Sequence, residues 1–63
     1  MNIHNIKKNT INLLKKERVV TSNEVAIKLN ISWNTAEKYL LELTIDSRII
    51  RIKKQGVNLW LLK

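Results

Sequence analysis

The sequence predicts an α+β domain of three helices followed by a C-terminal β-hairpin, formed by the whole chain from residue 1 to residue 63. Three observations predict this fold. Apolar residues recur at helical spacing in residues 2–17. Two further helical runs occupy residues 21–45, and residues 48–62 are rich in β-branched residues around the only glycine, Gly56. A chain of 63 residues has room for one domain with a small core.

An apolar stripe defines the first predicted helix, which spans residues 2–17 and has Asn2 or Asn5 as its cap. The stripe consists of Ile3, Ile6, Thr10, Ile11, Leu13 and Leu14. The other side of this helix carries Lys7, Lys8, Lys15 and Lys16. We interpret these lysines as a solvated face rather than as ligand contacts.

Residues 21–43 predict two helices joined by a tight turn, and the rest of the chain is organised around them. Thr21 and Glu24 have the spacing of a capping box, in which each side chain bonds the other's backbone N–H. Asn30 suits the turn, and Ser32 suits the N-cap of the second helix. Such a helix-turn-helix can place its second helix in the major groove of DNA. A plain helical hairpin in a small core would give the same pattern.

Three segments are predicted to form strands. Arg18-Val19-Val20 is a short β-prone stub, and residues 48–52 and 57–62 form a hairpin whose turn is residues 53–56. The 48–52 strand could also pair with the stub, which would extend the hairpin to a three-stranded sheet. Ser47 occupies the position where a glycine is expected after the second helix of the pair.

The charge of the chain indicates a polyanionic partner. Its net charge is +7 and its pI is about 10.2, which is typical of a nucleic-acid-binding domain. Residues 1–16 and 47–63 carry four and five basic residues and no acid, whereas residues 17–46 carry three bases and five acids. We therefore expect phosphate contacts from the flanks and base contacts from polar side chains of the helix-turn-helix.

Several classes of site find no support in the composition. The chain has no cysteine and one histidine, His4, so we expect no metal and no cofactor. We also expect no enzymatic activity and no small-molecule ligand, since there is no nucleophile–base pair and no glycine-rich phosphate loop. No apolar run approaches a membrane span, and the N-terminus lacks a signal-peptide core. We expect the protein in the cytoplasm, associated with the nucleoid.

The order of these elements resembles that of winged helix-turn-helix domains, in particular the small regulators of archaea, their plasmids and viruses. The resemblance covers residues 10–62 and rests on the pattern Ile31-Ser32-x-x-Thr35-Ala36-x-x-x-Leu40-x-x-Leu43, followed by Ile49 and a basic hairpin ending in Trp60. Ser47 stands where the family usually has glycine. The resemblance implies that helix 32–45 reads the major groove and that the hairpin 48–62, the wing, contacts the backbone or the minor groove.

The resemblance also implies the DNA-contacting residues. Those of the reading helix are Ser32, Trp33, Asn34, Thr35, Glu37 and Lys38, and those of the wing are Arg51, Lys53, Lys54 and Gln55. Asn34 suits adenine, and Lys38 suits guanine or phosphate. Glu37 could accept from cytosine or balance local charge. Trp33 and Tyr39 could each contact DNA or cover the core.

The chain has more apolar residues than so small a core is expected to bury. We therefore predict a homodimer, with an interface built from Ile3, Ile6, Leu13, Trp60 and Leu62. The alternative is that all of these side chains belong to the core of a single chain.

The function predicted from these observations is binding of double-stranded DNA by a transcriptional regulator. One alternative is an architectural or replication-associated DNA-binding protein with little sequence preference. Another is a winged-helix module that binds proteins, for which a neutral or acidic wing would be more usual.

Overall fold

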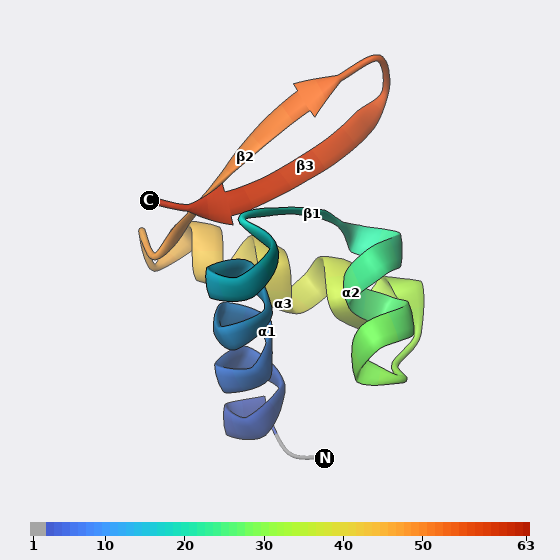
Figure 1. Ribbon diagram of the computed structural model, residues 1–63, viewed down its shortest axis with the longest axis vertical. Coiled ribbons are helices and arrows are strands. Elements are labelled where there is room, and N and C mark those ends of the chain that lie inside the picture. Colours follow the sequence, from blue (N-terminus) through green and yellow to red (C-terminus); the bar gives the residue numbers. More distant parts are fainter. Residues whose placement is uncertain (1–2) are drawn as a thin grey trace.

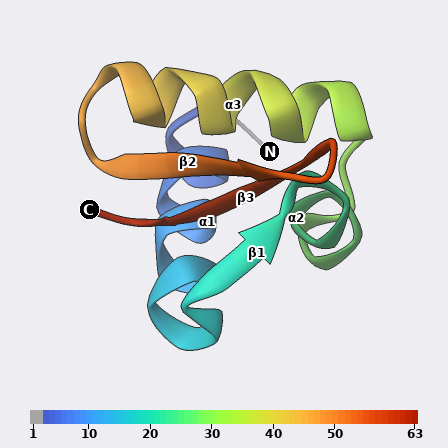
Figure 2. The same cartoon turned by 90° about the horizontal axis from the view of Figure 1, so that it is seen from above.

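Three helices lie on one face of a three-stranded antiparallel sheet, and the hairpin projects beyond them (Figures 1 and 2). The computed structural model describes residues 3–63, with side chains from residue 5 onward. Its elements are α1 (Ile3–Glu17), β1 (Val19–Thr21), α2 (Ser22–Leu29), α3 (Trp33–Ile45), β2 (Ile49–Lys54) and β3 (Val57–Leu62). The predicted fold class and order of elements are confirmed.

The strand order corrects one predicted pairing. The order is β1-β3-β2, so the stub pairs with β3 through Val20 opposite Trp60, and not with β2. The last strand of the chain is therefore the central strand, bonded on both edges. One face of β3, which carries Trp60, packs against the helices, whereas Val57, Leu59 and Leu61 point to the other face.

The inner face of the sheet forms one side of the core. Val20, Ile49 and Trp60 point towards the helices and are buried. Apolar side chains from all three helices pack against them, namely Ile11, Leu14, Val25, Ala26, Ala36, Leu40 and Leu43. The small residues Ala26 and Ala36 come from α2 and α3, the two helices of the helix-turn-helix.

Two residues predicted for the dimer interface lie in this core. Ile6 is 6% exposed and Trp60 is 0% exposed, so neither can present a surface to a second chain. Leu13 and Leu62 are half-buried and pack against the core. The side chain of Ile3 lies outside the described residues. The structure thus corrects the prediction for Ile6 and Trp60, because both side chains are buried within the single chain.

Local capping chemistry sets the ends of α2 and α3 as predicted. Glu24 N–H donates to Thr21 Oγ1 at 3.1 Å, and Thr21 N–H donates to Glu24 Oε1 at 2.8 Å. Thr35 N–H donates to Ser32 Oγ at 3.1 Å, which caps α3. Because each cap joins residues only three positions apart in the sequence, both caps could be predicted from the sequence.

Each of the three helices is followed by a non-glycine residue in the left-handed region. The φ angles are 72° at Arg18, 55° at Asn30 and 62° at Ser47. At Ser47 the chain reverses so that Arg48 N–H donates to Leu43 O at 3.0 Å. Serine therefore adopts the conformation that glycine would adopt without steric cost.

Ser47→Gly should stabilise the protein by about 0.5–1 kcal/mol, because it removes the Cβ that disfavours the left-handed conformation. Thermal and urea denaturation would measure the change. Lys8→Gly, at an exposed position inside α1, is the matched control and should destabilise by about 0.5–1 kcal/mol. If both variants lowered the free energy of unfolding equally, the backbone at Ser47 would not be strained.

The hairpin turn is tighter than predicted. Only Gln55 and Gly56 form it, with φ angles of 52° and 80°, as in a two-residue type I′ turn. Lys53 and Lys54 consequently belong to β2, not to the loop at the tip. Adjacent strand residues point to opposite faces, so these two lysines face different sides of the wing.

Candidate nucleic-acid interface

The outward side of α3 forms a stripe with a polar start and an apolar end. Asn34, Lys38, Leu41 and Ile45 follow one another at i, i+4, i+7 and i+11, and all four are exposed. The opposite side of the helix, which includes Ala36, Tyr39, Leu40 and Leu43, is buried. The polar first half of the stripe is thus presented to solvent by a helix that is anchored in the core.

The acidic residues of α3 and its C-cap are held by partners within the chain. Lys7 Nζ lies 3.1 Å from Glu42 Oε1 and 3.9 Å from Asp46 Oδ2. Glu37 accepts hydrogen bonds at both carboxylate oxygens. The slight excess of acid in residues 17–46 is therefore partly neutralised by α1 and does not lie along the exposed stripe.

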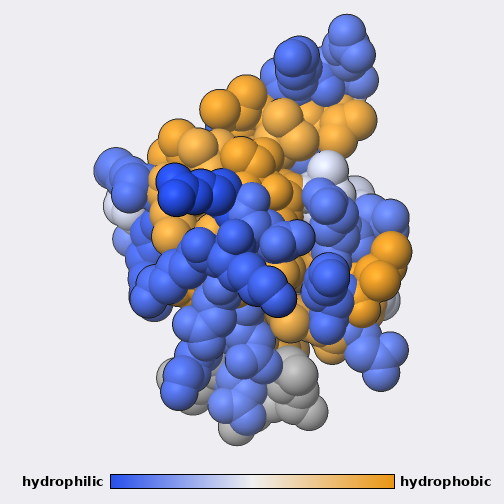
Figure 3. Space-filling model, in the orientation of Figure 1, coloured by the Kyte–Doolittle hydropathy of each residue, from blue (hydrophilic) through white to orange (hydrophobic). Residues whose placement is uncertain are grey.

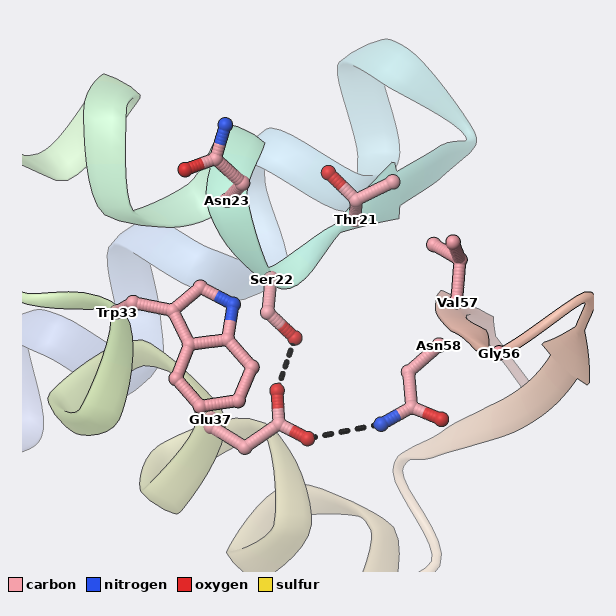
Figure 4. Close-up of a pocket in the computed structure, with 8 residues that line it drawn as sticks. All are labelled: Thr21, Ser22, Asn23, Trp33, Glu37, Gly56, Val57 and Asn58. Atoms are coloured by element: carbon pink, nitrogen blue, oxygen red, sulfur yellow. Dashed lines mark hydrogen bonds between the residues drawn. The ribbon is translucent and has the colours of Figure 1, made fainter.

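Glu37 joins three elements (Figure 4). Ser22 Oγ at the start of α2 donates to Glu37 Oε2, and Asn58 Nδ2 on β3 donates to Glu37 Oε1 at 2.9 Å. Ser22 Oγ in turn accepts from Trp60 Nε1 at 2.9 Å. This chain of bonds ties the wing to α3. Each oxygen of Glu37 thus already accepts one hydrogen bond within the chain, and the predicted base contact of Glu37 stays a prediction.

The cations of the wing divide between its two faces. Arg51 pairs across the sheet with Trp60, and Lys53 with Asn58, so both lie on the face that looks towards the helices. Lys54 pairs with Val57 and lies on the other face, and Gln55 is in the turn. Lys53 is thus directly opposite the residue whose amide is bonded to α3.

A hollow of about 280 Å³ separates the start of α3 from the tip of the wing (Figure 4). It is lined by Thr21, Ser22, Asn23, Trp33, Glu37, Gly56, Val57 and Asn58. Trp33 is 51% exposed, so its indole forms a wall of this hollow and does not cover the core. An indole wall beside uncharged polar groups suits a sugar or a base edge better than a phosphate, which the Glu37 carboxylate would repel.

Lys38 and Tyr39 have separate roles. Tyr39 is buried on the inner side of α3, which settles the choice between core and DNA contact in favour of the core. Lys38 Nζ lies 5.4 Å from the centre of the Tyr39 ring. This cation–π contact steadies a lysine that remains exposed to solvent.

Two solved structures share the arrangement. The Zα domain of PKZ from Carassius auratus, solved in complex with Z-DNA, has a TM-score of 0.90 and 13% identity over 97% of each chain. A doubly substituted variant of ZitR from Lactococcus lactis in its apo form has a TM-score of 0.83 and 28% identity over 98% of this chain and 48% of that one. This chain therefore spans about half of ZitR.

The chain has the winged helix-turn-helix fold. In this fold α2 and α3 are the two helices of the helix-turn-helix, and the second of them, α3, has the position called the recognition helix. The hairpin of β2 and β3 is the wing. No protein-family model matches the sequence, and no curated protein matches it in sequence.

The predicted site residues lie in different parts of the winged-helix fold. Trp33, Asn34 and Lys38 are exposed in the first half of the recognition helix, and the same half is bonded to the wing through Glu37 and Asn58, the cross-strand partner of Lys53. Ser32 is occupied with its cap, since its hydroxyl donates to Thr35 Oγ1 at 2.8 Å. Lys54 and Gln55 lie farther out, at the wing tip.

Sequence reasoning missed Ser22 and Asn58, which hold Glu37. Asn58 was detectable in principle, since it is the one polar residue inside the apolar run of β3. A buried amide in a strand usually has a hydrogen-bond partner, but its identity depends on the fold.

The part of the chain that the structure describes contains no helix long and apolar enough to cross a membrane. It also contains no group of three or more His, Cys, Asp or Glu side chains placed to hold a metal ion.

Proposed function

We propose that this protein binds double-stranded DNA and acts as a transcriptional regulator. The recognition helix enters the major groove, and the wing lies along the adjacent backbone or minor groove. One observation carries the proposal: Glu37, in the same turns of α3 as the exposed Asn34 and Lys38, is bonded to Asn58, the cross-strand partner of the wing cation Lys53. The acids of α3 are meanwhile engaged inside the chain. The Zα neighbour, which was solved with Z-DNA, supports a nucleic-acid partner for this fold.

Each residue has a task that follows from its position. Asn34 presents a donor and an acceptor, which match the edge of adenine. Lys38 donates to guanine or to a phosphate, and Arg51 and Lys53 neutralise phosphates next to the groove. The first backbone N–H groups of α3, together with the Thr35 hydroxyl, suit a phosphate at the helix start.

The double substitution of Lys53 and Lys54 by alanine should weaken binding to all duplexes alike. It should also flatten the log–log dependence of affinity on salt by about one to two units, because each lost phosphate contact removes about 0.9. Fluorescence anisotropy with a labelled duplex at several salt concentrations would measure both effects.

The matched control replaces Lys15 and Lys16 of α1, which carry the same charge but belong neither to the recognition helix nor to the wing. This variant should keep the wild-type slope. Equal flattening by both double variants would show that binding follows net charge alone, without a defined wing contact.

The same titration separates the regulator from an architectural DNA-binding protein. A regulator prefers its site over random duplex by a factor of about 10³ or more, whereas an architectural protein has a ratio near one. Selection from a random duplex pool would supply the preferred site. A B-form and a Z-form duplex should be compared in parallel.

The homodimer stays a prediction with fewer candidate contacts. Leu13 and Leu62 keep partial exposure and could still meet a second chain, whereas Ile6 and Trp60 cannot. A dimer would present two recognition helices to successive turns of the major groove, about 34 Å apart. Sedimentation of the free protein would test whether it forms a dimer.

We also propose that the protein acts in the cytoplasm, on the nucleoid.

A further inference from the structure

The outer face of the sheet, which points away from the helices, is apolar and uncovered. Strand register places Val19, Leu61 and Ile50 in one row and Thr21, Leu59 and Ile52 in the next. Val57 and Lys54 complete the face at the wing end. Val19, Ile50, Ile52 and Val57 are 38–49% exposed, and Leu59 and Leu61 are half-buried. We call this surface the outer apolar face, consisting of Val19, Ile50, Ile52, Val57, Leu59 and Leu61.

Figure 3 shows apolar residues gathered over the sheet, while polar residues cover α1 and the end of the hairpin. A contiguous apolar surface of this kind on a small protein usually marks a site of interaction. Single exposed apolar residues are ordinary, but here they occupy the same side of three adjacent strands.

A hollow of about 500 Å³ lies at one end of this face. Its apolar floor is formed by Leu14, Val19, Leu61 and Leu62, and its other two lining residues are the cations Lys15 and Arg18. Val19 and Leu61 belong to the outer apolar face as well, so the hollow and the face are continuous. Among the residues that the structure describes, none that lines the hollow or lies on the face is acidic.

We propose that the outer apolar face and its hollow dock a segment of another protein, an amphipathic helix whose apolar stripe is flanked by Asp or Glu. The six-residue strands give the face a length of about 20 Å, which matches roughly four helical turns. One large apolar side chain of the helix fills the hollow, and a neighbouring carboxylate meets Lys15 and Arg18. This is recognition of a helix in a groove, with charge complementarity at its end.

Charge and side-chain chemistry disfavour two other occupants. A second copy of this chain would bring the same cations and the same hollow to the interface, without carboxylates on the face to meet them. A membrane surface is usually met by Trp or Tyr side chains, but the apolar side chains of this face are all aliphatic. The residues that line the hollow would also not reach the flat surface of a bilayer.

The inference does not depend on DNA binding, because the face lies on the other side of the sheet from the helices. The test is a titration of ¹⁵N-labelled protein with a synthetic amphipathic helix of about four turns, which carries Leu on one side and Glu on its flanks. Its amide signals should shift at β1, β2, β3 and the end of α1. A peptide with Lys in place of Glu should bind at least tenfold more weakly.

Ile52→Lys is the decisive variant, since it puts a charge on the face and also increases the positive charge of the protein. Docking on the face predicts at least tenfold weaker binding of the Glu peptide. Attraction by net charge alone predicts stronger binding and would overturn the proposal. Ile52 is 47% exposed, so the variant should fold, and its circular dichroism and melting temperature would verify this.

Lys15→Glu, at an exposed position of α1, should weaken the Glu peptide several-fold and leave a neutral Gln peptide unchanged. The Glu peptide should still bind in the presence of saturating duplex DNA, so a failure here is distinct from a failure of the proposed function. Two outcomes would contradict the proposal. One is self-association of the protein through the face, and the other is binding of anionic lipid vesicles that Ile52→Lys abolishes.

Discussion

Replacing Trp60 with alanine should leave the protein largely unfolded at 25 °C. Trp60 is fully buried in the core, and its Nε1 donates to Ser22 Oγ. A buried Trp→Ala change costs about 3–5 kcal/mol, which is comparable to the whole stability that a core of this size usually supplies. Urea denaturation followed by circular dichroism would measure the loss.

Trp33→Ala is the matched control, because it removes the same side chain from an exposed position. It should change the free energy of unfolding by about 0.5 kcal/mol or less. The contrast also tests the location of Trp60. If Trp60→Ala gave a folded monomer with an unchanged melting temperature, Trp60 would lie at an interface and the inner face of the sheet would be misplaced.

Asn34→Ala and Lys38→Ala should each relax the base preference at a defined position of the preferred site. The loss of discrimination should be about 1–3 kcal/mol if the lost contact is bidentate. Lys38→Ala should also weaken binding to random duplex, since a lysine that reaches guanine can equally reach phosphate. Competition binding with a set of single-base site variants would measure both quantities.

Lys28→Ala provides the control for Lys38→Ala. Lys28 is exposed on α2 and lies outside the stripe of α3. Its removal should leave the base preference unchanged. If Asn34→Ala and Lys38→Ala both kept the wild-type preference at every position, α3 would not be the element that reads the bases.

Local chemistry made much of the fold predictable. The reciprocal bonds of Thr21 and Glu24, and the cap at Ser32, involve residues within three positions of each other. Helix starts could therefore be placed from sequence alone. The expected glycine position at Ser47 was also placed correctly, since serine there adopts the left-handed conformation.

Long-range contacts could not be predicted in the same way. The bond between Glu37 and Asn58 joins residues 21 positions apart, and the bond between Trp60 and Ser22 joins residues 38 positions apart. Nothing in the neighbourhood of Glu37 distinguishes a base-reading carboxylate from one that anchors the wing. Its role becomes visible only once β3 lies between β1 and β2.

The apolar surplus was recognised from the sequence, but two of the residues assigned to it, Ile6 and Trp60, are buried. Alternation along β3 tells which side chains share a face, but not which face the helices cover. The helices cover the face of Trp60, so the uncovered side chains are those of Leu59 and Leu61, together with Val19, Ile50, Ile52 and Val57.

We propose that one surface, formed by the start of α3 and the inner side of the wing, contacts duplex DNA. The most direct measurement is the set of amide signals of ¹⁵N-labelled protein that shift when its selected duplex is added. We predict shifts at Asn34, Lys38, Arg51 and Lys53, with little change along β1. Shifts confined to α1 or to β1, with α3 and the wing unchanged, would contradict the claim.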